Sequence, residues 1–298
     1  MYNININIVK DNNMTKPIKY TINENYFDDV NTEEKAYILG LLYADGCNSF
    51  DKYNSITLTL KSEDKYILEK ISKIIFKNFR PLYHVKEHNI QIGDKVYKCS
   101  DQYTLNIVNK HMSSKLNELG VVKNKSNVIT FPYFINKNLY RHFIRGYFDG
   151  DGCITKVNRE SKNTKYTEYM ASFVSNREFC MNVKNILSQE ININPLIIKH
   201  KNVFRLQMFG NNISELFLKW IYENNTICLK RKEKLYNELI EYKKNKKKEK
   251  QEKYKNIMFS KLRNQYSLYI NDGYGKRKHR GYYKTLKSAQ EAFKRMSN

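Results

Sequence analysis

The chain of 298 residues has few cysteines, few acidic residues and no long apolar segment. No stretch is long and apolar enough to span a membrane, and Met1–Lys10 lacks the layout of a signal peptide. The five cysteines include no Cys-x-x-Cys pair, so neither a disulfide framework nor a zinc site is indicated. Six scattered histidines form no cluster, which disfavours a histidine-based metal centre. These features predict a reduced, intracellular, cytoplasmic protein without a membrane segment.

Acidic residues are scarce relative to basic ones. Asp and Glu together number 30, against 53 Lys and Arg, and the formal net charge is +23. An excess of this size favours a polyanionic partner. An AT-rich coding sequence also enriches Lys, Asn, Ile and Tyr, which is an alternative explanation for part of the lysine content. The shortage of acids is harder to explain in that way.

Two segments of the chain are near-copies of each other. Residues 36–47 read AYILGLLYADGC, and residues 142–153 read HFIRGYFDGDGC. When Asp45 is aligned with Asp151, both segments have Gly five residues earlier and a small residue directly before the Asp. A single Asp-Gly is adequately explained as the end of a helix. Two matched copies predict instead two helices that bring a pair of carboxylates side by side.

The small residues in each copy predict how the two helices pack. Gly40 and Ala44 are four residues apart and share one helix face, and Gly146 and Gly150 do the same. A stripe of small side chains lets two helix backbones approach closely. We therefore expect these four residues to form the seam between the helices.

The ends of the first helix are also predictable. Asn31 or Thr32 is expected to cap its start. Gly46, like Gly152 in the second copy, is expected to take the left-handed conformation that often ends a helix. The two carboxylates would then lie at the negative ends of two helix dipoles. Ionisation is costly there, and a divalent cation would relieve the cost.

The similarity continues beyond these segments, with the two Asp residues 106 positions apart. Each copy is followed by expected helices and by expected strands in which polar and apolar residues alternate. This order predicts an α+β fold of two pseudo-symmetric αββαββα units. The polar face of the expected strands lacks acids. A solvated face is the default explanation, but hydrogen-bonding and basic side chains also suit base edges and phosphates. These candidate DNA-binding residues are Ser55, Thr57, Thr59, Gln102, Thr104, Asn106, Arg205 and Gln207.

At this point the chain resembles the LAGLIDADG homing endonucleases. The nine motif positions fall on Ile38–Gly46 and Ile144–Gly152, and the lead-in Asn25–Tyr37 is also similar to members of this family. The resemblance covers residues 25–240, and two motifs in one chain match the monomeric branch. It implies paired motif helices and two curved sheets that sit over the DNA major groove. It also implies double-strand cleavage of a long, specific DNA site with Mg²⁺, for which Mn²⁺ is a possible substitute.

The resemblance assigns roles to residues at the ends of the two motifs. Asp45 and Asp151 match the metal-binding acids of the family. The backbone carbonyls of Ala44 and Gly150, directly before them, match its backbone metal ligands. We therefore expect these four residues to hold the metal.

The basic residue of the family's active site is matched in one copy. Lys61, at the end of an expected strand, lies at the matching position, whereas Asn176 stands there in the second copy with Arg177 next to it. Either Arg177 takes this role or one DNA strand is cut more slowly. The motif's other acidic position is Tyr43 in the first copy and Asp149 in the second, and we assign no chemistry to it.

The chain changes character after residue 222. Lys230–Tyr242 is expected to be helical, and Lys243–Lys255 to be an exposed helix or a tether. Residues 265–296 then predict short strands around a Gly-rich basic turn, followed by a helix capped by Thr285 or Ser288. This stretch resembles the AP2-type DNA-binding domain, in which a small sheet lies in the major groove. The resemblance implies contacts to phosphates or bases by Arg277, Lys278, His279 and Arg280, and the alternative is a basic hairpin that adds only electrostatic affinity.

The sequence therefore predicts a monomeric, site-specific endonuclease that acts on double-stranded DNA. The expected domains are an N-terminal arm (1–30), two LAGLIDADG units (31–130 and 131–240), a lysine-rich helical linker (241–256) and an AP2-like domain of ββ(β)α form (257–298). Two other functions stay open. One is an intron RNA maturase, which would make intron RNA a partner. The other is a catalytically inactive, sequence-specific DNA-binding protein.

Overall fold

The structure is a computed structural model that describes residues 20–50, 53–78, 80–93, 95–123, 125, 128–161, 164–254, 256–271 and 277–297. Most of the expected N-terminal arm and the Gly-rich part of the expected basic turn, residues 272–276, lie outside the described residues. The chain divides into two compact units, Met1–Lys234 and Leu235–Asn298. The expected boundaries within and between them stay predictions.

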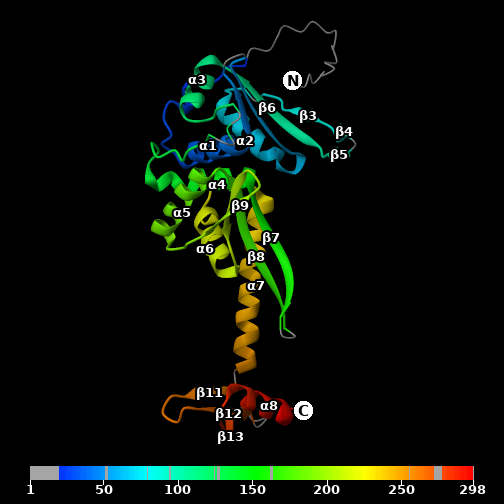
Figure 1. Ribbon diagram of the computed structural model, residues 1–298, viewed down its shortest axis with the longest axis vertical. Coiled ribbons are helices and arrows are strands. Elements are labelled where there is room, and N and C mark those ends of the chain that lie inside the picture. Colours follow the sequence, from blue (N-terminus) through cyan, green and yellow to red (C-terminus); the bar gives the residue numbers. More distant parts are fainter. Residues whose placement is uncertain are drawn as a thin grey trace. The chain divides into compact units, whose positions relative to one another are not determined.

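The first unit contains the αββαββα order twice (Figure 1). The first copy consists of α1 (Glu33–Asp45), β1 (Gly46–Ser49), β2 (Ser55–Lys61), α2 (Lys65–Ile75), β3 (Tyr83–Val85), β6 (Gln102–Val108) and α3 (Lys110–Glu118). A hairpin of β4 (His88–Ile92) and β5 (Lys95–Cys99) is inserted before β6. The second copy consists of α4 (Tyr140–Asp151), β7 (Gly152–Ser161), β8 (Thr164–Ser175), α5 (Arg177–Ile191), β9 (Leu196–His200), β10 (Val203–Met208) and α6 (Asn211–Tyr222). The predicted α+β fold class is confirmed.

Each copy forms one antiparallel sheet with the same strand order. The orders are β1-β2-β6-β3 and β7-β8-β10-β9, so β3 and β9 are equivalent edge strands. The first strand of each sheet follows its motif helix without a break, and it pairs Gly46 with Leu58 or Gly152 with Phe173. Short 3-10 helices lead into α1, α2 and α4, namely η1 (Glu24–Phe27), η2 (Ser62–Asp64) and η4 (Lys137–Leu139).

The strands bury one face and leave the other polar, as the alternation predicts. In β2, Ile56, Leu58 and Leu60 are at most 6% exposed, while the intervening polar residues stay partly exposed. The register pairs Thr59 with Thr104, and their hydroxyl oxygens lie 2.9 Å apart. The buried face of each sheet packs against helices of its own copy, and the polar residues on the other face are partly exposed.

The two motif helices α1 and α4 pack directly against each other where the copies meet (Figure 1). A Cβ on Gly40 would lie 2.0 Å from the carbonyl oxygen of Phe143, and one on Gly146 would lie 2.0 Å from that of Tyr37. No side chain fits at such distances. Small residues therefore lie where the two helix backbones approach most closely, and this close packing fixes the relative placement of the two copies.

The start of α1 follows the prediction, but the ends of the motif helices do not. Thr32 is the N-cap residue and accepts a hydrogen bond from the amide of Lys35. The expectation that Gly46 and Gly152 are left-handed is wrong, because their φ angles are −74° and −78°. Glycine is required there for space instead. A Cβ on Gly46 would lie 2.6 Å from the carbonyl oxygen of its own helix's Leu42.

The C-terminal unit pairs a small sheet with a helix. Most of α7 (Lys230–Tyr254) belongs to this unit, and the lysine-rich segment within it is helical, one of the two expected forms. Strands β11 (Ile257–Ser260), β12 (Gln265–Asn271) and β13 (Arg277–Tyr283) form an antiparallel sheet in that order, followed by α8 (Leu286–Ser297). Ile257, Leu268 and Ala289 make the core between sheet and helix. The hydroxyl of Thr285 accepts from the amide of Ser288 at the start of α8, as one of the two expected caps.

No helix within the described part of the chain combines the length and the apolar character that crossing a membrane requires.

Candidate active site

The two motif carboxylates lie together at the ends of the paired helices. Asp45 is the last residue of α1 and Asp151 the last of α4. A Cβ on Gly150 would lie 2.3 Å from the Cβ of Ala44 and 2.9 Å from Oδ2 of Asp45. The Asp45 carboxylate therefore rests against the residue that precedes Asp151. The seam brings the four expected metal-site residues together, and their role in holding a metal stays a prediction.

This proximity changes the acidity of both groups. Burial and, to a smaller extent, the charge of Asp151 raise the pKa of Asp45 from 3.8 to about 6, although the charges of Lys232 and Lys125 act in the opposite direction. Burial also raises the pKa of Asp151. Both residues nevertheless keep an exposed edge. The site thus concentrates negative charge in partly desolvated surroundings, which a bound cation would stabilise.

Two lysines that the sequence reasoning did not select stand beside these carboxylates. Lys125 donates to the carbonyl oxygen of Gly46 at the end of α1. Lys232 lies at the end of α4, where its Nζ donates to the carbonyl oxygens of Phe148 (2.5 Å) and Gly152 (2.6 Å). Each ammonium group therefore caps the negative end of one motif helix.

The two lysines are related by the internal duplication. Each follows the last helix of its copy, in the stretches VVKNK (121–125) and CLKRK (228–232). A Lys-x-Lys pattern thus recurs 107 residues later, and this repeat is the signal that could have identified them. Burial lowers the pKa of Lys232 to about 8 and also lowers that of Lys125. Both cations lie among the charges that act on Asp45 and Asp151.

A buried hydrogen-bond network holds Lys232 in place. Asp149 is fully buried, and its carboxylate accepts from the hydroxyls of Tyr37 (2.8 Å) and Tyr222 (2.6 Å) and from the amide of Leu229 (2.7 Å). The hydrogen bond from the Leu229 amide to Asp149 ties the segment that carries Lys232 to α4. The second acidic position of the motif is therefore used for structure.

The equivalent position in the first copy does the same with different chemistry. The hydroxyl of Tyr43 donates to the carbonyl oxygen of Leu119, at the end of α3 and shortly before Lys125. Both copies thus use this position of the motif helix to fix the segment that leads to the lysine. The Tyr-for-Asp difference between the motifs is therefore explained by these structural contacts, with Asp45 present in one motif and Asp151 in the other.

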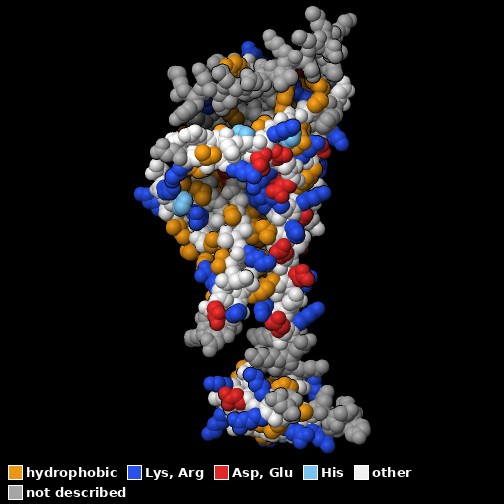
Figure 2. Space-filling view, turned by 90° about the vertical axis from the view of Figure 1, so that its right-hand side faces the viewer, with side chains coloured by type: hydrophobic (Ala, Val, Ile, Leu, Met, Phe, Trp, Pro, Cys, Tyr) orange, Lys and Arg blue, Asp and Glu red, His pale blue; other side chains and the backbone are white. Residues whose placement is uncertain are grey.

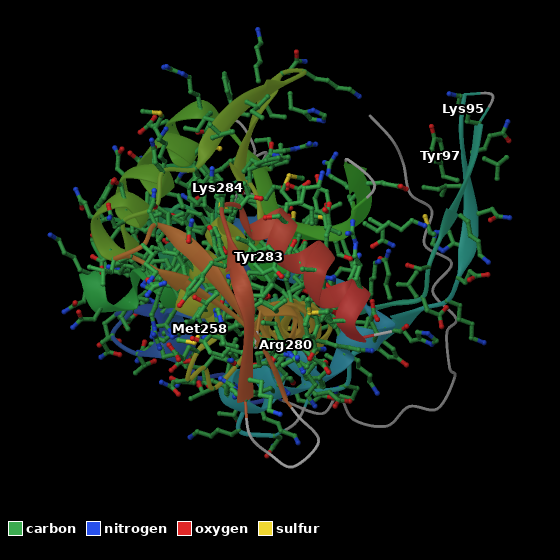
Figure 3. All side chains as sticks on the ribbon, turned by 90° about the horizontal axis from the view of Figure 1, so that it is seen from below. Lys95, Tyr97, Met258, Arg280, Tyr283 and Lys284 are labelled. Atoms are coloured by element: carbon green, nitrogen blue, oxygen red, sulfur yellow. The ribbon has the colours of Figure 1, made fainter. Side chains whose placement is uncertain are left out.

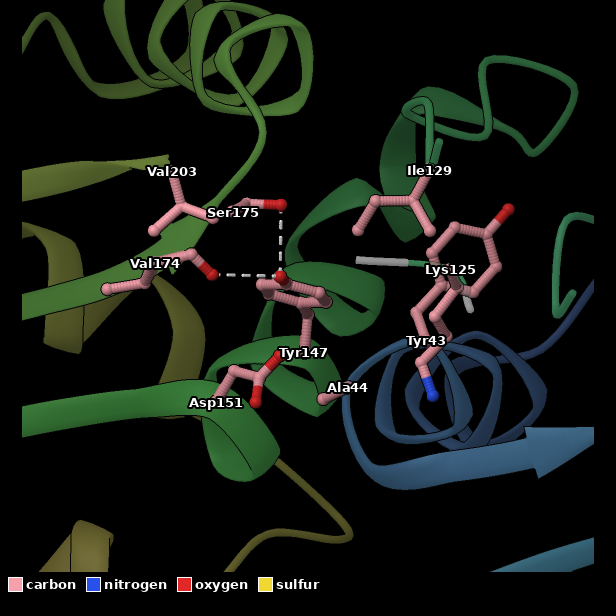
Figure 4. Close-up of a pocket in the computed structure, with 9 residues that line it drawn as sticks. All are labelled: Tyr43, Ala44, Lys125, Ile129, Tyr147, Asp151, Val174, Ser175 and Val203. Carbon is pink, nitrogen blue, oxygen red and sulfur yellow. Dashed lines mark hydrogen bonds between the residues drawn. The ribbon is translucent and has the colours of Figure 1, made fainter. Parts of the chain in front are cut away.

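A pocket of about 240 Å³ opens beside Asp151 (Figure 4). Tyr147 lines it and donates to the carbonyl oxygen of Val174 (3.2 Å) and to Oγ of Ser175 (3.1 Å). The other lining residues are Tyr43, Ala44, Lys125, Ile129 and Val203. Residues from both copies therefore form this pocket, which places a space of mixed polar and apolar lining next to one of the two carboxylates.

The three other expected catalytic residues lie at strand or helix ends. Lys61 is the exposed last residue of β2, and Arg177 is the exposed first residue of α5. Asn176 caps α5, because its Oδ1 accepts from the amide of Phe179 (2.8 Å) and its Nδ2 donates to the carbonyl oxygen of Ile129 (2.7 Å). Both polar atoms of that side chain are thus engaged in structure. Catalytic roles for these residues stay predictions.

The donor atoms at the seam fit a hard divalent cation. Two carboxylates and nearby backbone carbonyl oxygens are the kind of ligand that Mg²⁺ prefers. Within the part of the chain that the structure describes, no group of three or more His, Cys, Asp or Glu side chains is assembled to hold a metal. A metal held here would therefore depend on Asp45, Asp151 and backbone oxygens, with water completing its shell.

The candidate DNA-binding residues fall in two places. Those on β2, β6 and β10 share the polar faces of the two sheets, in partly exposed positions. Arg277, Lys278 and Arg280 are exposed on β13 of the C-terminal unit, where Figure 3 labels Arg280. Contact with DNA by either set stays a prediction.

Comparison with protein families gives a match over part of the chain. Residues 138–254 match a family model described as a LAGLIDADG-like domain. This range includes the second motif, Asp151 and Lys232. The match covers the second copy and α7.

Curated relatives match the chain over limited parts of their own length. The glutamine–fructose-6-phosphate aminotransferase of Methanocaldococcus jannaschii is 26% identical over 227 residues, which are 74% of this chain and 19% of that protein. The probable cell division protein WhiA of Clostridium botulinum is 25% identical over 141 residues, 45% of this chain and 42% of that protein. The chain thus spans less than half the length of either relative.

Solved structures with similar folds include LAGLIDADG proteins. The I-LtrWI LAGLIDADG homing endonuclease bound to target DNA is 16% identical with a TM-score of 0.49, covering 72% of this chain and 91% of that one. The N-terminal LAGLIDADG domain of WhiA is 18% identical with a TM-score of 0.40, covering 68% of this chain and 89% of that one.

Proposed function

We propose that the chain is a LAGLIDADG endonuclease that cuts both strands of a specific DNA site with the help of a divalent cation. The observation that carries this proposal is the pair of carboxylates, Asp45 and Asp151, at the ends of two duplicated helices, each helix end held by its own lysine. A DNA duplex presents two scissile phosphates related by an approximate two-fold axis. A duplicated site within one chain matches that substrate, so we expect a monomer to be sufficient.

The residues at the seam have separate tasks in this proposal. Asp45, Asp151 and the carbonyl oxygens of Ala44 and Gly150 would hold Mg²⁺, or Mn²⁺ in its place. When bound, the ion would supply Lewis-acid polarisation of the phosphate and lower the pKa of a water molecule. Lys125 and Lys232 keep two positive charges beside the carboxylates, in surroundings where charge is poorly screened. Such fixed charges stabilise negative charge that develops at a phosphate during cleavage.

The polar faces of the two sheets form the proposed DNA contact surface. They carry hydroxyl, amide and guanidinium groups, which donate to phosphates and read base edges. The inserted β4–β5 hairpin would lengthen this surface. It projects from the first copy, with Lys95 and Tyr97 standing clear of the sheet in Figure 3.

The C-terminal unit is proposed as a second, AP2-like DNA-binding element. Its β13 is basic and exposed, and Lys and Arg side chains cover more of the face of this unit seen in Figure 2 than Asp and Glu do. A module joined to the first unit by the chain would raise affinity through effective concentration. It would thereby extend the recognised site without taking part in cleavage.

A cleavage assay tests the endonuclease proposal. The substrate is a plasmid carrying the chain's preferred site, obtained by selection from random duplexes. Asp45→Asn and Asp151→Asn should each abolish linearisation in Mg²⁺ while leaving DNA affinity within about tenfold, since each removes a metal ligand but few DNA contacts. Glu118→Gln, at an exposed acid of α3, is the matched control and should cut normally. Linearisation at the wild-type rate by either Asp variant would refute the site assignment.

A binding-only function is the second candidate. The relative named as a probable cell division protein, WhiA, supports it because that name describes no cleavage. The intact carboxylate pair favours cleavage instead. A wild-type chain that binds its selected site tightly but leaves the plasmid uncut in Mg²⁺ and Mn²⁺ would support the second candidate.

A further inference from the structure

The two equivalent edge strands carry exposed apolar side chains. In β3, Tyr83 is 57% exposed and Val85 is 40% exposed. In β9, Leu196 is 53% exposed and Ile198 is 46% exposed. Single exposed apolar residues need no explanation. Here, however, a pair recurs on the edge strand of each copy, where exposed apolar surface promotes aggregation and is normally avoided.

These side chains lie on the polar faces of the sheets. The register places Leu196 opposite Gln207 and Ile198 opposite Arg205, so both share the face of those polar residues. In the first copy, Val85 lies opposite Gln102 in the same way. The apolar pairs therefore form the outer margins of the proposed DNA contact surface.

The residue between each apolar pair lies on the opposite face of its strand and contacts the protein. His84, between Tyr83 and Val85, stacks on the ring of Tyr103 with centroids 4.6 Å apart. Ile197, between the two exposed residues of β9, is partly buried. The alternation thus directs one side chain to the protein and the next outward, and the outward ones are the apolar residues.

The chemistry of DNA limits what such side chains can contact. In the major groove the bases present hydrogen-bond donors and acceptors, and the apolar group among them is the C5-methyl of thymine. The excess of basic residues makes a polyanion the complementary partner, and Arg205 stands next to Ile198 on the same face. A groove-facing strand with apolar side chains beside basic ones therefore suits thymine.

We propose that Leu196 and Ile198, with Val85 in the other copy, read thymine methyl groups in the outer parts of the DNA site. This inference rests on the proposed DNA-binding function. The polar residues of the inner strands would recognise bases by hydrogen bonding. The edge strands would instead select thymine over cytosine and over uracil by contact with the methyl group.

Removal of the methyl group alone tests the inference. In duplexes of the selected site, each thymine is replaced in turn by deoxyuracil, which keeps base pairing and lacks only the methyl. Burial of one methyl contributes about 0.8 kcal/mol, so wild-type affinity should fall roughly fourfold at each contacted position. We expect such positions in the outer part of each half-site, measured by fluorescence anisotropy with the full chain.

Variants of β9 connect the effect to its residues. Leu196→Asn and Ile198→Asn should bind the thymine and deoxyuracil duplexes equally at the positions that they read. Leu216→Asn is the matched control, because Leu216 is also an exposed leucine (47%) but lies on α6. The control should keep the fourfold preference for thymine. A preference that persists in both β9 variants would overturn the assignment.

The outcomes separate this inference from the function on which it rests. Specific, tight binding with no deoxyuracil effect in the outer half-sites refutes thymine reading and leaves the proposed endonuclease intact. Selection that yields no preferred site refutes the proposed function itself. A dimer in analytical ultracentrifugation that Leu196→Asn dissociates would show that a second copy covers this surface, and it would also overturn the inference.

Discussion

Replacement of Asp45 by Asn should stabilise the metal-free protein at neutral pH. The folded state raises the pKa of Asp45 from 3.8 to about 6, a difference that corresponds to about 3 kcal/mol of unfavourable ionisation. Because the residue keeps an exposed edge, solvent screening reduces this, and we expect roughly 1 to 2 kcal/mol. Asn keeps the size of the side chain and removes the charge. The expected rise in Tm is roughly 2 to 6 °C.

The pH dependence of this difference has a definite sign. Below about pH 4, Asp45 is protonated in both the folded and the unfolded chain, so Asp45→Asn should change stability little. Between pH 4 and 6 the unfolded chain releases the proton while the folded chain retains it, and the wild type loses stability relative to the variant. Above about pH 6 the difference should be complete and constant.

The single tryptophan makes the measurement specific to the first unit. Trp220 lies on α6, so its fluorescence reports the unfolding of this unit. Wild type and Asp45→Asn are melted from pH 4 to 8 in EDTA, with Glu118→Gln as an exposed-acid control. Added Mg²⁺ should raise the Tm of the wild type through binding to the folded state and leave Asp45→Asn unchanged. A variant that is no more stable than the wild type at pH 7.5 would refute the charge argument.

Four further results are expected. Gly146→Ala would bring a Cβ to 2.0 Å from the carbonyl oxygen of Tyr37, and it should cost about 3 kcal/mol in the same fluorescence assay; an unchanged Tm would contradict the seam. Lys232→Met should slow cleavage by roughly 10- to 1,000-fold with little loss of DNA binding. Lys61→Met should slow cleavage of one DNA strand more than cleavage of the other. Single-turnover assays with end-labelled DNA distinguish these effects, and normal rates would exclude both residues from catalysis. A chain ending at Tyr242 should still cut at high enzyme concentration but show a shallower dependence of log K on log salt, by roughly one unit per phosphate contact removed; an unchanged slope would mean that the C-terminal unit does not contact DNA.

Features that depend on residues close together in the chain could be predicted from the amino-acid sequence alone. The alternation in β2 and the small-residue stripes of α1 and α4 are local patterns, and hydrophobic burial and steric fit act on them directly. Two matched copies of such a pattern were sufficient to predict a pair of motif helices with Asp45 beside Asp151.

Sequence rules for helix ends were less reliable at glycine, because glycine can be required either for a left-handed backbone or for lack of space for a Cβ. Gly46 follows a helix, which favours a left-handed conformation. Its backbone is extended instead, and glycine is needed because the Leu42 carbonyl leaves no room for a Cβ. Steric contact, rather than the handedness of the backbone, decides the residue at this position.

Only the tertiary structure showed what lies beside the carboxylates. Lys232 reaches the carbonyl oxygens at the end of α4 from more than 80 residues away, and Asp149 holds its segment through the amide of Leu229, 80 positions along the chain. Both contacts form because α6 folds back and the following segment returns to the seam. Their energy depends on a desolvated position that exists only once the helices are packed, so the repeated Lys-x-Lys pattern can mark the lysines but cannot give their contacts.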